Sequence, residues 1–101
     1  MKLQSYRISI KTLEDLEKIW LYTFKKWFAD QADRYYSIII DEIEFLTSHF
    51  NSGKSAEHIR DGYRTAKVKS HLIFYRMSED QKLEVIRILH QNLDVDDRLK
   101  Q

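Results

Sequence analysis

Apolar residues recur at two different spacings along this chain, and each spacing predicts a different kind of element. Residues 5–10 alternate between polar and apolar side chains and carry β-branched isoleucines, which is typical of a strand. Thr12 and Asp15 then have the spacing of a helix cap. The residues that follow predict an amphipathic helix of about four turns, with its apolar positions at Leu13, Leu16, Ile19, Trp20, Phe24 and Trp27.

A second run of helical spacing follows a short break at residues 28–29. Asp30 and Asp33 have the spacing of another cap, and Asn51-Ser52-Gly53 is typical of a helix end. Because the break is short, we expect the two helices to lie antiparallel as a hairpin. The apolar positions of the second helix are Ala32, Tyr35, Tyr36, Ile39, Ile43, Leu46 and Phe50.

The C-terminal half returns to the pattern of strands. Three segments, roughly 63–69, 71–77 and 82–90, are rich in β-branched and aromatic residues and are separated by short turns. Residues 91–101 form a polar tail. The predicted fold class is therefore α+β: an N-terminal strand, an antiparallel two-helix hairpin, and a three-stranded antiparallel meander, in a single domain over residues 1–101.

The two later strand segments are apolar on both faces. Along residues 71–77, one face carries Ile73 and Tyr75 and the other carries Leu72 and Phe74, and the next segment has the same pattern. A two-helix hairpin can cover only one face of such a sheet, whereas a solvated face normally carries polar residues. A partner protein is the favoured cover for the second face. The alternative is that the first strand and the C-terminal tail fold over it.

Composition narrows the class of protein. A chain of 101 residues with 43% hydrophobic residues fits one folded core. There is no cysteine, no apolar run near the roughly 20 residues that span a bilayer, and no signal-peptide pattern at the N-terminus, so we expect a cytoplasmic protein without a membrane segment. The formal charge is +1, so any basic site must be local.

The motifs of common catalytic and cofactor sites are not found. The four histidines show no metal-ligand spacing, and there is no Gly-rich phosphate loop or nucleophile turn. We therefore predict no metal, no cofactor and no catalytic residues. The cations within the strand segments, chiefly Arg64, Arg76, Arg87 and His90, leave three roles open: binding a partner, pairing within the sheet, or clamping a phosphate in a phosphoryl-transfer reaction.

Three short motifs then point to a family. They are Tyr63-Arg64, the run from Ser70-His71 to Tyr75-Arg76, and Arg87-Ile88-Leu89-His90. In this order and spacing they resemble the C-terminal half of the ParE toxins, within the RelE/ParE toxin–antitoxin superfamily. The N-terminal half is similar to the helices of that family in a less specific way. The resemblance implies the same strand, helix hairpin and meander that the periodicity predicts.

The resemblance implies the toxin of a bacterial type II toxin–antitoxin system, of the kind that stabilises plasmids. ParE toxins inhibit DNA gyrase by protein–protein contact, and a cognate antitoxin neutralises them. The alternative is a ribosome-dependent messenger RNA endoribonuclease of the RelE type. Such nucleases use an arginine where this chain has Leu72 and carry more lysines than Lys54 before the meander. A related subgroup of nucleases ends in a histidine–tyrosine pair, of which this chain has only His90. These departures favour the ParE branch and an inhibitor that is not an enzyme.

The resemblance also directs attention to contact residues. We expect a ParD-like antitoxin to lay an amphipathic helix or strand over the apolar sheet face and the hairpin, in an oligomeric complex. We expect no sequence-specific binding of nucleic acid by the chain itself. Removal of Arg76 or Arg87 is expected to weaken toxicity and leave the fold intact, provided that the side chain is partly exposed, and Tyr75 is the expected aromatic anchor. The residues predicted to bind target or antitoxin are Arg64, His71, Tyr75, Arg76, Arg87 and His90.

Overall fold

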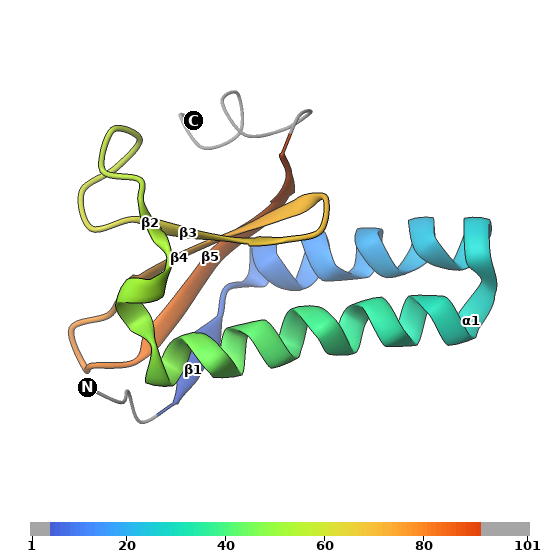
Figure 1. Cartoon of the computed structure of the whole chain (residues 1–101), viewed down its shortest axis with the longest axis horizontal. Coiled ribbons are helices and arrows are strands. Elements are labelled where there is room, and N and C mark those ends of the chain that lie inside the picture. The colour runs from blue at the N-terminus through green and yellow to red at the C-terminus, as the bar shows by residue number, and fades with distance from the viewer. Residues whose placement is uncertain (1–4, 92–101) are drawn as a thin grey trace.

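The computed structural model of the protein describes residues 5–91. Its helical part lies against one face of a sheet (Figure 1), so the α+β class is as predicted. Within residues 5–91, no helix is both long and apolar enough to cross a bilayer. The elements in chain order are β1 Tyr6–Ile8, α1 Ile10–Ser48, the short 3-10 helix η1 Phe50–Ser52, β2 Lys54–Ser55, β3 Arg64–Val68, β4 His71–Met77 and β5 Leu83–His90.

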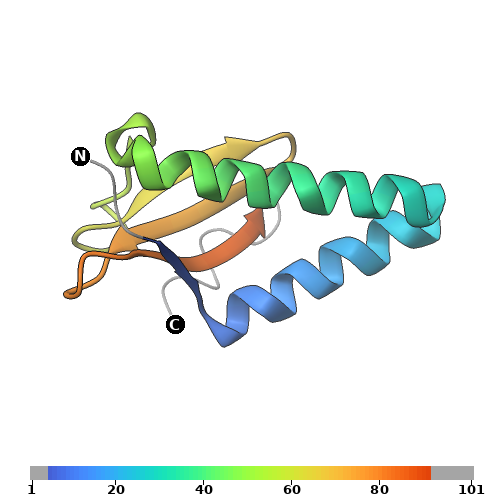
Figure 2. The same cartoon turned by 90° about the horizontal axis from the view of Figure 1, so that it is seen from below.

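The helical part differs in detail from the two separate helices that we predicted. α1 is one element of 39 residues, and Phe28 has a backbone conformation inside it that is not helical, with φ 70° and ψ −179°. The chain reverses there, so the two arms of α1 run side by side in opposite directions (Figures 1 and 2). We refer to residues 10–27 as the first arm and to residues 29–48 as the second arm.

The start of the helix also differs from the prediction. The N-cap is Ser9, whose Oγ accepts a hydrogen bond of 3.0 Å from the backbone N–H of Thr12. Thr12 is fully buried, and its hydroxyl donates to the carbonyl of Val85 at 3.2 Å. The cap therefore lies three residues earlier than predicted, because the sheet holds the side chain of Thr12.

The sheet is wider than the predicted meander. Its strand order is β1-β5-β4-β3-β2, with β1 parallel to β5 and the other neighbours antiparallel. The sheet therefore has five strands and is mixed, with β1 and β2 added at its two edges. β1 pairs with β5 from Tyr6 opposite Leu83 to Ile8 opposite Val85. A parallel neighbour requires a long crossover connection, and α1 is part of that connection.

Beyond Ile8, the start of α1 takes the place of a strand along the edge of β5. Ser9 donates its backbone N–H to the carbonyl of Val85 at 3.2 Å and its hydroxyl to the carbonyl of Ile86 at 3.0 Å. The N–H of Ile88 donates to Oδ2 of Asp15 at 3.0 Å. The edge of β5 is thus satisfied by the first turns of the helix, which fixes the first arm relative to the sheet.

Buried residues form two clusters. The main cluster lies between α1 and the sheet and includes Leu16, Ile43 and Ile73. The second cluster contains Phe74 and Leu89 on the other side of the sheet, together with Ala56 and Tyr63 from the loop between β2 and β3. That loop therefore covers part of the second face.

Our alternative cover for that face was the first strand together with the tail. The part concerning the first strand is wrong, because β1 extends the sheet at its edge. The tail of residues 92–101 lies outside the described residues.

The far half of the first arm is much less buried than its helical pattern suggested. Leu16 is only 2% exposed, whereas Phe24 and Trp27 are 41% and 61% exposed. Figures 1 and 2 show the reason, since the bent end of α1 projects past the sheet. An apolar stripe on this helix therefore faces the core only where the sheet lies beneath it.

Candidate functional site

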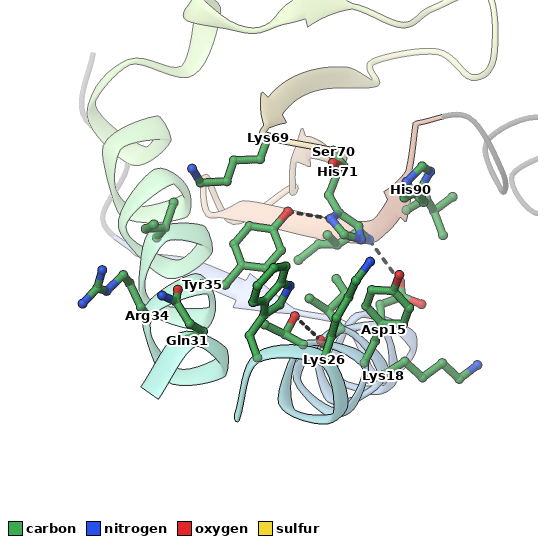
Figure 3. Close-up of a pocket in the computed structure, with 17 residues that line it drawn as sticks. Asp15, Lys18, Lys26, Gln31, Arg34, Tyr35, Lys69, Ser70, His71 and His90 are labelled. Carbon is green, nitrogen blue, oxygen red and sulfur yellow. Dashed lines mark hydrogen bonds between the residues drawn. The ribbon is translucent and has the colours of Figure 1, made fainter. Parts of the chain in front are cut away.

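An open groove of about 880 Å³ lies where the projecting part of α1 overhangs the end of the sheet. The two arms of α1 form its walls, and the turn between β3 and β4 and the end of β5 form its other side (Figure 3). The turn is tight, since Lys69 and Ser70 alone separate the strands and Lys69 has φ 52°. The residues that line the groove are Asp15, Lys18, Ile19, Tyr22, Thr23, Lys26, Trp27, Gln31, Arg34, Tyr35, Ile38, Lys69, Ser70, His71, Ile88, Leu89 and His90.

The groove is locally basic, although the whole chain has a formal charge of only +1. Lys18, Lys26, Arg34 and Lys69 line it and are exposed. Among its described lining residues Asp15 alone is acidic, and its carboxylate is engaged by the sheet. The exposed side chains of Tyr22, Trp27 and Ile38 complete the walls. The groove therefore combines cations with apolar surface, as a binding site for an acidic amphipathic segment requires.

Two histidines and a tyrosine form one side of the groove. His71 on β4 and His90 on β5 are register partners, and their rings meet edge to face with centroids 5.5 Å apart. Oη of Tyr35 lies 2.6 Å from Nδ1 of His71 and donates to the carbonyl of Val68 at 3.3 Å. Figure 3 shows Tyr35 and His71 pointing toward each other across the groove. Burial raises the pKa of Tyr35, so its hydroxyl is neutral near pH 7 and positions the His71 ring.

Arg87 and Asp15 form a buried ion pair behind the groove. Nε and Nη2 of Arg87 donate to the two oxygens of Asp15 at 2.8 and 2.9 Å. The side chains are only 11% and 5% exposed. Two parallel hydrogen bonds of this kind are strong and directional. The pair joins α1 to β5, so Arg87 supports the fold. The sequence predicted that Arg87 contacts a partner and gave no sign that this side chain is buried.

Arg64 and Tyr75 lie at the opposite end of the sheet, where they are register partners. Nη2 of Arg64 donates to the carbonyls of Asn51 at 3.0 Å and of Gly53. Tyr75 is fully buried, and its hydroxyl donates to the carbonyl of Phe50 at 2.7 Å. Both side chains thus hold the segment after α1 against the sheet. The ring of Tyr75 is buried in this structure, so it is not available on the surface as the aromatic anchor that the sequence predicted.

Arg76 occupies a third place, near the turn between β4 and β5. Its Nε donates to Oε1 of Glu84 at 2.7 Å, and its side chain is 49% exposed. Glu84 also lies 3.5 Å from Nη1 of Arg7, which binds Asp80 at 2.8 Å. These residues form a network of charges on the surface. Pairing within the sheet was one of the three roles that the sequence left open for Arg76, and Arg76 makes such a pair here.

The six predicted contact residues are therefore not one cluster. The structure brings His71 and His90 together in the groove and leaves Arg76 on the surface elsewhere. The sequence reasoning missed the helical side of the groove. A signal was present, because Lys18, Tyr22 and Lys26 are four residues apart and so share one face of the first arm. Among the described residues, no cluster of His, Cys, Asp and Glu could hold a metal ion.

Comparisons with known proteins agree with this fold. The family described as the ParE toxin of type II toxin-antitoxin system, parDE, matches residues 6–95. Toxin ParE1 of Mycobacterium tuberculosis is 35% identical over 94 residues, which cover 93% of this chain and 96% of that protein. Toxin ParE1 of Caulobacter vibrioides is 35% identical over 92 residues, which cover 91% of this chain and 94% of that protein.

Two solved structures are similar in fold at 18% sequence identity. The chromosomal ParDE toxin–antitoxin system from P. aeruginosa matches with a TM-score of 0.75 over 87% of this chain and 96% of that chain. The RelBE2 toxin–antitoxin complex from Mycobacterium tuberculosis matches with a TM-score of 0.61 over 90% and 94%. The family match and the curated relatives span nearly the whole described chain, and this chain therefore belongs to the ParE toxin family of type II toxin–antitoxin systems.

Proposed function

We propose that this chain is the toxin of a bacterial type II toxin–antitoxin pair, that it acts in the cytoplasm by inhibiting DNA gyrase through protein–protein contact, and that a cognate antitoxin neutralises it. Membership of the ParE family supports the toxin role. The target and the antitoxin are the parts of the proposal that need direct tests.

The three arginines of the sheet lie apart from one another. This observation favours an inhibitor over a nuclease. A site that stabilises charge on a scissile phosphate needs cations that converge on one point. Here Arg87 binds Asp15, Arg64 binds backbone carbonyls, and Arg76 binds Glu84. These partners hold the three guanidinium groups at separate places on the sheet, so these arginines do not form a shared clamp for RNA.

Leu72 adds to this argument. It occupies the position at which RelE-type nucleases are expected to carry an arginine, and it packs partly buried against the cluster of Phe74 and Leu89. An apolar side chain in that place supplies no charge to a transition state. The ribosome-dependent nuclease is therefore the less supported reading.

The basic groove supports the antitoxin part of the proposal. An amphipathic helix or strand could lay its apolar side against Ile19 and Ile38 and direct its carboxylates toward Lys26, Arg34 and Lys69. The sequence placed the antitoxin on the second sheet face and the hairpin. Because the loop between β2 and β3 covers part of that face, we place the antitoxin in the groove. Of the six residues predicted from sequence, His71 and His90 are the ones that would touch it.

A supercoiling assay tests the target. Purified gyrase, relaxed plasmid and ATP are incubated with increasing amounts of the folded chain, and we expect loss of supercoiling and accumulation of cleaved DNA complexes. Adding the product of the neighbouring gene should restore supercoiling. If a large excess of folded chain leaves supercoiling unchanged, gyrase is the wrong target. Cleavage of messenger RNA on ribosomes by the same preparation would favour the nuclease instead.

A further inference from the structure

The bent end of α1 carries an exposed aromatic cluster that the core does not use. We call Phe24, Trp27 and Phe28 the hairpin tip. Their exposures are 41%, 61% and 76%. The tip projects beyond the sheet, at the end of the molecule farthest from β2 (Figures 1 and 2). Large aromatic side chains this exposed, gathered in one place, mark a surface that meets another molecule.

The backbone at the tip is strained. Phe28 has φ 70° and ψ −179°, a region that is essentially restricted to glycine because a Cβ atom crowds the backbone there. Glycine would make the same reversal without strain, and the phenylalanine ring makes little compensating contact within the chain since it is 76% exposed. Strain of this kind is typical of sites at which the side chain serves a function.

The tip is also held rigid from behind. The rings of Trp20 and Phe24 stack with centroids 5.2 Å apart and an interplanar angle of 10°. Nε1 of Trp20 donates to Oδ1 of Asp33 at 2.9 Å, which ties the first arm to the second. The backbone of the tip and the Phe24 ring are therefore held in place before a partner binds, and this favours tight binding.

Charge indicates what kind of surface fits the tip. Lys25 and Lys26 lie between the aromatic residues and no carboxylate does, while Nζ of Lys26 lies 5.7 Å from the centre of the Tyr22 ring. A complementary surface has an apolar pocket with carboxylates on its rim. The lysines are two compact charges beside three aromatic rings, and a pocket of a folded protein can match both features at fixed positions.

We propose that the hairpin tip is the surface by which this toxin contacts its target, with Trp27 and Phe28 entering an apolar pocket whose rim is acidic. This inference rests on the proposed function, namely that toxicity arises from contact with a target protein. It assigns the contact to helical residues, in place of the sheet arginines and Tyr75 that the structure shows to be engaged or buried.

Phe28→Gly is the most informative variant, because it removes the ring and the strain together and Phe28 does not line the groove. Trp27→Ala is the second variant. Ile10→Ser is the matched control, since Ile10 is 77% exposed and lies at the other end of the first arm. Each variant is compared with the wild-type chain for gyrase inhibition, growth arrest on expression without antitoxin, thermal melting, and co-purification with the antitoxin.

We expect Phe28→Gly and Trp27→Ala each to weaken gyrase inhibition and growth arrest by at least about tenfold, as loss of a central aromatic anchor does. Phe28→Gly should melt at or above the wild-type temperature and still bind antitoxin, and Ile10→Ser should behave as wild type. Full potency of both tip variants would overturn the inference. So would sedimentation of the wild-type chain with phosphatidylglycerol vesicles that depends on Phe28, which would make the tip a membrane surface.

The two proposals fail in different ways. If the wild-type chain arrests growth without inhibiting gyrase, only the proposed target is wrong. The growth arrest caused by each tip variant then still tests whether the tip contacts the target. Inhibition of gyrase by the wild-type chain and by both tip variants contradicts the tip alone. A wild-type chain that neither inhibits gyrase nor arrests growth overturns both.

Discussion

Replacing Arg87 with methionine should destabilise the protein strongly. The sequence-based expectation of an intact fold applied only to a partly exposed side chain, and that of Arg87 is 11% exposed. The variant keeps the carboxylate of Asp15, which is 5% exposed, but removes both guanidinium hydrogen bonds from it. Breaking one side of a buried ion pair costs about 3–5 kcal/mol, because the remaining charge is left without its partner.

The expected change in melting temperature follows from the size of the domain. A loss of 1 kcal/mol lowers the melting temperature of a domain of this size by roughly 4–8 °C. Arg87→Met should therefore melt at least about 12 °C below the wild-type chain when both are measured by circular dichroism at pH 7.

Arg76→Met is the matched control. Its guanidinium makes an equally short contact with Glu84, at 2.7 Å, but its side chain is 49% exposed. Surface pairs of this kind contribute about 0–1 kcal/mol, so this variant should melt within a few degrees of the wild-type chain. If the Arg87 and Arg76 variants melt at similar temperatures, the buried pair does not support the fold as argued.

The double variant Asp15→Asn with Arg87→Met separates lost charge from lost packing. Asparagine is neutral and its side-chain oxygen can still accept the hydrogen bond from the N–H of Ile88, which is 3.0 Å from the carboxylate of Asp15. We expect the double variant to be more stable than Arg87→Met alone, because no unpaired charge remains buried. A double variant that is no more stable than Arg87→Met would contradict this explanation.

Two further predictions concern the opposite end of the sheet. Gly53→Ala should lower the free energy of unfolding by roughly 1–3 kcal/mol in a denaturant titration, because a Cβ atom at Gly53 would collide with the hydroxyl of Tyr75 and the carbonyl of Thr65; an unchanged midpoint would contradict this. Burial raises the pKa of Tyr75 above its usual value, because the folded protein favours the neutral phenol. The stability that this phenol contributes is therefore complete below about pH 10, the pKa of an unfolded tyrosine. It is lost as the pH rises through the pKa of the folded state. Melting temperatures measured between about pH 8 and pH 11 should therefore fall less steeply for Tyr75→Phe than for the wild-type chain.

The pattern along the chain was sufficient for the class of fold and for the approximate places of most elements. The strand segments predicted at 63–69, 71–77 and 82–90 correspond to β3, β4 and β5, because alternation of apolar residues reports directly on the two faces of a strand. The chain reversal near residue 28 was likewise visible as a break in helical spacing. These features depend on residues that are close in sequence.

What the sequence by itself could not determine was which surfaces meet. The Arg87–Asp15 pair joins residues 72 positions apart, and the parallel pairing of β1 with β5 is equally distant, so neither leaves a local pattern. The exposure of Phe24 and Trp27 likewise leaves no local pattern. Their spacing is that of a core face, but the end of the helical hairpin extends past the sheet. Periodicity records the geometry within one element, whereas burial is decided by the elements packed against it, and only the tertiary structure supplies these.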